Sequence, residues 1–191
     1  MIKDPLRSRR DAFILIPLVM LTAAAAELAM GRRVWGIGGT PGLWSGNIWS
    51  SHNSQFLFDP YTFTHITHGI LLYAFLTLTF KTLPVSTRLL LAVGLESAWE
   101  VLENTTIVIE RYRAETISLN YYGDSVMNSM GDILACMTGF VLASRLPKRV
   151  IILGAVGLEL LLVVWTRDNL ALNLVMLIHP SRTIRVWQLG Q

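Results

Sequence analysis

The chain has 191 residues, of which 52% are hydrophobic and only 15% are charged, and its mean hydropathy is +0.48. Its charges fall in short clusters between apolar runs, which is the layout of a polytopic membrane protein rather than a soluble globule. The net charge of +3 comes from basic residues that flank these runs and form no basic face, which excludes nucleic acid as a partner. The single cysteine, Cys136, excludes an intramolecular disulfide.

The apolar runs predict an all-α fold, a polytopic integral membrane helical bundle that forms one transmembrane domain over residues 1–191. A basic head followed by an apolar run also fits a secretory signal peptide, but the later runs are themselves membrane-spanning and favour a first span. Residues 169–180 are apolar but too short for the roughly 20 residues that a span needs, so we expect five to six transmembrane helices. The spans are predicted at residues 12–30, 61–80, 88–109, 123–144 and 150–165, with 169–180 as a short sixth.

The connections suggest an orientation. Residues 31–60 are rich in glycine and contain Trp35, Trp44 and Trp49, which predicts an irregular external loop lying on the membrane. Residues 110–122 are predicted to form a polar loop. With the N-terminus inside, nine Lys and Arg residues lie in the inner segments and five in the outer ones, before the tail is counted. Because inner loops carry the excess of basic residues, we expect a cytoplasmic N-terminus.

The third predicted span carries three carboxylates. Glu96, Glu100 and Glu103 are spaced i, i+4 and i+7, so they share one face of a helix. A charged side chain at mid-bilayer costs roughly 2.5–3.5 kcal/mol even on the mildest scale. These side chains therefore need partners, protons or a cation.

Two other predicted spans bring polar groups to the same depth. His65 and His68 lie in the first turns of the second span, and Asp124, Asn128 and Asp132 are spaced i, i+4 and i+8 in the fourth. Imidazoles and carboxylates at one depth are typical ligands of zinc and transition metals, so a divalent metal ion is the expected cofactor. The candidate metal ligands are His65, His68, Glu100 and Asp124, and the candidate catalytic residues are Glu100, Glu103, Asp132 and Asn128.

A structural interpretation of the same residues stays open. Histidines near the end of a span often only pack between helices, and buried carboxylates in the neutral form can hydrogen-bond across helices. Glu96 fits a structural role as well as a functional one, and Asn104 fits a hydrogen-bonded helix end. Gly131 and Gly139 would allow close helix approach.

Three sequence blocks carry a resemblance to a known group: Glu96 to Asn104, Tyr121 to Ser129 and Arg167 to Asn173. In these blocks the chain resembles a family of small multi-pass inner-membrane proteins of unknown function found in alphaproteobacteria. The resemblance implies a location in the bacterial inner membrane and no particular activity. Over a shorter stretch, Asp124, Asn128 and Gly131 are similar to the Asp…Asn…Gly helix of VanZ-like membrane proteins.

Three functions fit these observations. The first is a membrane-embedded, metal-dependent enzyme acting on a lipid or lipid-linked substrate, with the carboxylates serving as ligands or as general acid and base. The second is a small ion- or proton-coupled transporter, although the chain shows no internal repeat of the kind that many transporters have. The third is a non-catalytic membrane subunit or assembly factor, in which the polar groups join helices. The oligomeric state is left open.

Overall fold

The computed structural model describes residues 5–190, and these residues form α-helices, one short 3₁₀ helix and no β-strand. The predicted all-helical fold is therefore confirmed for the described part of the chain. In chain order the elements are α1 (Pro5–Ala29), η1 (Ile37–Gly39), α2 (Thr62–Thr79), α3 (Val85–Glu103), α4 (Thr106–Glu115), α5 (Val126–Arg145), α6 (Lys148–Thr166), α7 (Leu170–Ile178) and α8 (Arg182–Leu189).

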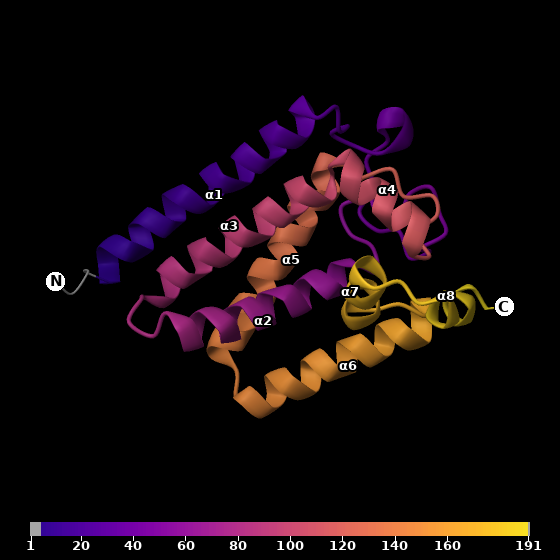
Figure 1. The fold of residues 1–191 in the computed structure, drawn as a ribbon. Coiled ribbons are helices and arrows are strands. Elements are labelled where there is room, and N and C mark those ends of the chain that lie inside the picture. Colours follow the sequence, from indigo (N-terminus) through magenta and orange to yellow (C-terminus); the bar gives the residue numbers. More distant parts are fainter. Residues whose placement is uncertain (1–4, 191) are drawn as a thin grey trace.

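Helix α5 is the centre of the bundle. It packs most extensively against α2, and also against α3, α1 and α6, while α1 packs along α3 on one side and α6 along α2 on the other. The long connection between α1 and α2, together with α4, α7 and α8, gathers at one end of the bundle (Figure 1). Only short turns join the helices at the opposite end, so the long connections and the short helices lie at one end alone.

Three helices in the described part are long and apolar enough to cross a membrane: residues Arg9–Ala29 of α1, α5 and α6. In the apolar 18-residue stretch of each helix, only 17% of the residues of α1 and 11% of those of α6 are buried within the protein, whereas 56% of those of α5 are buried. Helices α2 and α3 have 18 and 19 residues, but they carry the histidines and carboxylates noted above. Helices α1 and α6 thus present apolar side chains outward, while α2, α3 and α5 bury polar ones.

Glycine allows α2 and α5 to approach closely. A Cβ atom placed on Gly69 would lie 1.9 Å from the carbonyl oxygen of Cys136, and one placed on Gly139 would lie 2.0 Å from that of Ile66. Both contacts are with backbone, which cannot move aside as a side chain would. Gly139 therefore has the predicted role in helix approach, whereas Gly131 faces the carbonyl of Leu57 in the long connection.

The third predicted span, 88–109, is divided in the structure. Helix α3 ends at Glu103, with Asn104 as its C-cap, and α4 begins at Thr106 after Thr105 takes an extended conformation. The predicted polar loop 110–122 is wrong over its first half, because α4 continues to Glu115. Helix α4 packs against α7 at the end of the bundle, so the apolar residues after Asn104 contribute to that layer.

The tail does not form a sixth spanning helix. Helix α7 has nine residues, which at 1.5 Å per residue gives a length of about 14 Å, half of the ~30 Å hydrocarbon core. It is followed by α8, which the sequence analysis did not predict. Arg185 of α8 donates a hydrogen bond to the carbonyl of Ala114 in the last turn of α4. The tail therefore stays at that end.

The connection between α1 and α2 is fixed to the N-terminus of α5. The backbone N–H groups of Ser125, Val126 and Met127 donate to the carbonyls of Ser54, Arg33 and Val34. These bonds satisfy N–H groups that have no partner within a helix. Residues 31–60, predicted to lie on the membrane, thus cover the end of α5.

Candidate functional site

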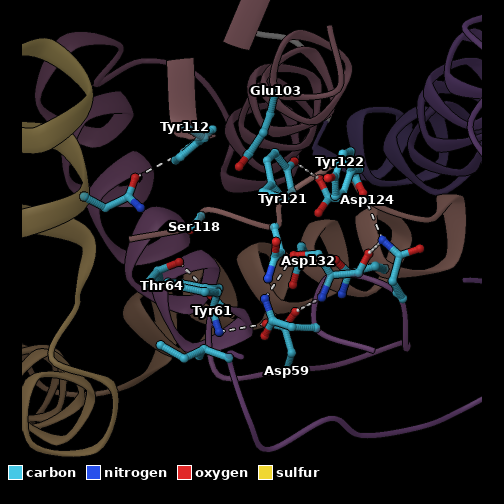
Figure 2. A pocket seen from close by; sticks show the side chains of 18 of the residues that line it. Asp59, Tyr61, Thr64, Glu103, Tyr112, Ser118, Tyr121, Tyr122, Asp124 and Asp132 are labelled. Atoms are coloured by element: carbon cyan, nitrogen blue, oxygen red, sulfur yellow. Dashed lines mark hydrogen bonds between the residues drawn. The ribbon is translucent and has the colours of Figure 1, made fainter. Parts of the chain in front are cut away.

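A cavity of about 750 Å³ lies at the end of the bundle where the long connections gather. Its walls come from α2, α3, α4, α5 and α7 and from the connections around residues 31–61 and 117–124. Figure 2 shows polar side chains of several elements turned toward this space, among them Glu103, Asp124 and Asp132. The rim reaches the surface at exposed residues such as Arg33, Trp49 and Tyr122.

Two histidines and one glutamate form a compact group at the floor of the cavity. One oxygen of Glu96, Oε1, lies 2.6 Å from Nδ1 of His65 and 3.0 Å from Nδ1 of His68. A carboxylate accepts hydrogen bonds, so both Nδ1 atoms carry the hydrogen when Glu96 is ionised. The Nε2 lone pairs of both imidazoles are then available. A carboxylate that orients an imidazole in this way is the usual second-shell partner of a metal-bound histidine.

His65 faces two further carboxylates. Its Nε2 atom is 3.8 Å from Oδ2 of Asp132, and its Nδ1 atom is 3.3 Å from Oε1 of Glu100. One ligand atom from each of His65, Glu100 and Asp132 can be chosen so that all three lie within 4.8 Å of one another. Oε1 of Glu100 and Oδ1 of Asp132 are buried and accept no hydrogen bond. This arrangement has the composition and spacing of a metal site.

Glu100 also belongs to a second group of possible ligands, which it forms with the carboxylates of Glu103 and Asp124. Ligand atoms of Glu100, Glu103 and Asp124 again lie within 4.8 Å of one another. Asp124 is held in place by the Tyr121 hydroxyl at 2.7 Å and by the side-chain amide of Asn104 at 3.1 Å, both donating to its Oδ2. Asn104 also accepts a hydrogen bond from the backbone N–H of Asp124. The C-cap of α3 therefore positions a carboxylate in the loop before α5.

Asp59 sets the start of α2 and hence the position of His65. Its two carboxylate oxygens accept hydrogen bonds from the backbone N–H groups of Ser54 and Tyr61, at 2.7 and 2.8 Å. Thr62 accepts a hydrogen bond from the backbone of Asp59. Burial raises the pKa of the Asp59 carboxyl, and these backbone hydrogen bonds oppose part of that rise.

Asp168 connects the tail to the cavity wall. It lies between α6 and α7 and accepts hydrogen bonds from the side chain of Gln188 in α8 and from the hydroxyl of Tyr61. Burial is the largest cause that raises the pKa of Asp168, to about 6, while its hydrogen bonds oppose the rise. The short tail helices are thereby fixed beside α2.

The structure brings most of the predicted site residues together, but not in the predicted grouping. His65, His68, Glu100 and Asp132 meet at the floor, and Glu103 and Asp124 adjoin them through Glu100. Asp124 does not share a face of α5 with Asp132, because α5 begins only at Val126. The predicted set of metal ligands therefore falls into two groups, with Asp124 away from the imidazoles.

Two of these residues make contacts that the sequence did not indicate. Asn128, a predicted catalytic residue, lines the cavity but donates its side-chain amide to the carbonyl of Phe56, which holds the long connection. Glu96, for which a structural role was equally open, is the residue that joins the two histidines. Its position one helical turn before Glu100 was the signal for this role. Asp59 was missed, since nothing in its loop sequence marks it.

A family model described as "Protein of unknown function (DUF2585)" matches residues 27–190. The chain belongs to this family. Its relatives include a UPF0314 protein of Brucella anthropi, 43% identical over 92% of this chain and 90% of the relative. The UPF0314 protein of Paracoccus denitrificans is 47% identical over 90% of this chain and 89% of the relative. These matches confirm the predicted resemblance to an alphaproteobacterial family. No solved structure matches the chain.

Proposed function

We propose that this DUF2585 protein is a multi-pass protein of the bacterial inner membrane and an embedded enzyme that uses a divalent metal ion to act on a lipid or lipid-linked substrate. The observation that carries the proposal is the group of His65, Glu100 and Asp132 at the cavity floor, with Glu96 orienting the imidazole. The transporter and the non-catalytic subunit are the alternatives.

The membrane arrangement that we propose has five spans, namely α1, α2, α3, α5 and α6. Helices α2 and α3 are as long as the others, and their polar side chains point to the interior, where they are not exposed to lipid. Because the tail stays at the cavity end, Arg182 and Arg185 count with the outer segments. Nine Lys and Arg residues then lie on the inner side and seven on the outer side. This division still favours a cytoplasmic N-terminus, and in that orientation the cavity would face the periplasm.

Metal chemistry is favoured by two buried carboxylate oxygens that accept no hydrogen bond. In a purely structural network, buried polar atoms are almost always hydrogen-bonded. Oε1 of Glu100 and Oδ1 of Asp132 are not, although their side chains are only 1% and 4% exposed. A bound cation would satisfy both oxygens. It would also polarise a substrate oxygen or activate a water molecule, while a neighbouring carboxylate served as general base.

The form of the cavity favours an amphiphilic substrate. Its rim combines the basic side chains of Arg32 and Arg33 with the apolar surfaces of Trp49 and Leu174, and its floor is acidic. A polar head group could reach the floor while an apolar chain stays near the rim, at the level where tryptophan lies at membrane interfaces. Volumes of this size accommodate small ligands.

The proposal is tested by measuring metal content. Detergent-purified protein should contain at least one equivalent of zinc, manganese or iron by mass spectrometry. His65→Gln and Asp132→Asn should each lose at least one equivalent. Glu159→Gln is the matched control, because Glu159 lies in α6 and outside all three groups of possible ligands; it should retain the wild-type content.

Absence of metal from the wild-type protein, even after incubation with each ion, would overturn the enzyme proposal. Proton or ion flux in proteoliposomes, abolished by Glu100→Gln, would then favour the transporter. Growth defects with neither metal nor flux would favour the non-catalytic subunit. If metal is present, turnover of defined lipid substrates is the next measurement.

A further inference from the structure

We propose that the cavity holds a second divalent cation, bound by Glu100, Glu103 and Asp124, and that the carboxylate of Glu100 bridges the two metal positions. This inference rests on the proposed metal-dependent function, in which the first cation is bound by His65, Glu100 and Asp132. It adds a site of different chemistry beside the first one. The two positions have Glu100 in common and share no other ligand.

The geometry gives each position its own set of ligands. The atoms of the second group lie within 4.8 Å of one another, as do those of the first. A carboxylate has two oxygens, so one side chain can serve two cations at once. Two-metal sites of this kind hold their ions about 3.5–4 Å apart. Glu100 is the only residue in both groups among the described residues.

The burial of Glu100 provides an independent indication of a ligand. Its side chain is 1% exposed, and its Oε1 accepts no hydrogen bond although it points toward the imidazole of His65. A buried oxygen without a hydrogen-bond partner is unfavourable, and more so when its group is charged. Glu100 belongs to both groups of possible ligands, so this buried carboxylate is a candidate ligand of either cation.

The charge of the cavity also favours more than one cation. Its lining contains five carboxyl groups, from Asp59, Glu100, Glu103, Asp124 and Asp132, in addition to the guanidinium groups of Arg32 and Arg33. Like-charged carboxylates at such short separations cannot all ionise without compensating positive charge. A pair of divalent cations would supply it at the place where the carboxylates meet.

The second position should prefer a harder ion than the first. Its three side chains offer only oxygen ligands, which suit Mg²⁺ and Mn²⁺, whereas the imidazole of His65 makes the first position suitable for zinc or iron as well. Asp124 is fixed by Tyr121 and Asn104. Such hydrogen bonds to a ligating carboxylate are part of the outer shell that sets metal affinity.

The experiment is a count of bound Mn²⁺. Detergent-purified protein is loaded with MnCl₂, freed of excess ion and measured for manganese per chain, and its electron paramagnetic resonance spectrum is recorded. We expect about two Mn²⁺ per wild-type chain and the spectrum of an exchange-coupled pair. Glu103→Gln and Asp124→Asn should each bind one uncoupled Mn²⁺, Asp132→Asn should lose the coupling, and Glu159→Gln should behave as wild type.

Tyr121→Phe tests the second position without altering a ligand. Removal of its hydroxyl should weaken the second Mn²⁺ by 10- to 100-fold and leave the first unchanged. One uncoupled Mn²⁺ in the wild type, unaffected by Glu103→Gln, would overturn the second site while leaving the metal-dependent function intact. No Mn²⁺ or other metal in any variant would overturn both. The wild-type spectrum decides between these outcomes even if a variant does not fold.

Discussion

Replacing Gly69 with alanine tests how the α2–α5 contact supports the site. The new Cβ would lie 1.9 Å from the carbonyl oxygen of Cys136, whereas real Cβ atoms almost never approach closer than 3.0 Å. The helices must therefore separate by at least 3.0 − 1.9 = 1.1 Å at this point. Overpacking of this kind costs about 1–3 kcal/mol. The higher helix propensity of alanine offsets at most roughly 0.5–1 kcal/mol of this cost.

The separation should also affect the cavity, because α2 carries His65 one turn before Gly69 and α5 carries Asp132. These side chains are 3.8 Å apart at His65 Nε2 and Asp132 Oδ2, so a shift of this size would draw the first group of ligands apart. We expect Gly69→Ala to reduce the metal content together with the stability.

Thermal unfolding in detergent, followed by tryptophan fluorescence, measures the effect. A loss of 1–3 kcal/mol corresponds to a fall in the midpoint of roughly 2–12 °C for a chain of this size. Gly154→Ala is the control, since a Cβ on Gly154 in α6 meets nothing within 4 Å; its midpoint should stay or rise slightly. If both variants had the same midpoint, the close approach of α2 and α5 would be refuted.

Three further predictions concern single side chains. Glu96→Gln removes the carboxylate that orients both imidazoles and should weaken metal binding 10- to 100-fold, measured by competition with a chelator. Asn104→Ala leaves the buried N–H of Asp124 without its partner and should lower the free energy of unfolding by about 1–3 kcal/mol in denaturant titrations. Asp168 has a pKa raised to about 6 from 3.8, so its contribution to stability is full below pH ~4 and is lost as the pH rises through ~6, by up to about 3 kcal/mol. Asp168→Asn should flatten the pH dependence of the unfolding midpoint in this window, and an unchanged slope would contradict the raised pKa.

The helices were largely predictable because each long apolar run exceeds what a loop can contain. What the sequence did not reveal is where polar residues interrupt a run. Asn104 and Thr105 end α3 inside a continuous predicted span. The side chain of Asn104 donates a hydrogen bond to Asp124, a partner 20 residues away that the local sequence does not reveal. Helix α8 was missed for a related reason. Its buried Gln188 binds Asp168, and that contact cannot be inferred from local pattern.

The cavity floor was predictable in part. Helical spacing placed Glu96 and Glu100 on one face, and alternating helix directions placed His65 and Asp132 at a similar depth. The grouping of these residues depends on rotation of the helices about their axes and on the true start of α5, neither of which hydropathy specifies. Asp124 shows the difference: a periodic pattern assigned it to a helix, but two side-chain partners hold it in a loop.

The division between apolar outer helices and polar inner ones has a consequence for biosynthesis. Helices α2 and α3 emerge from the ribosome before α5. In the proposed five-span arrangement, His65, Glu96 and Glu100 would therefore enter the membrane while Asp132 and the glycine contacts of α5 are still missing. Helices this polar insert poorly by themselves. In the five-span arrangement proposed above, nascent α2 and α3 would therefore have to remain beside α1 within the insertion machinery until α5 arrives with its polar and glycine contacts.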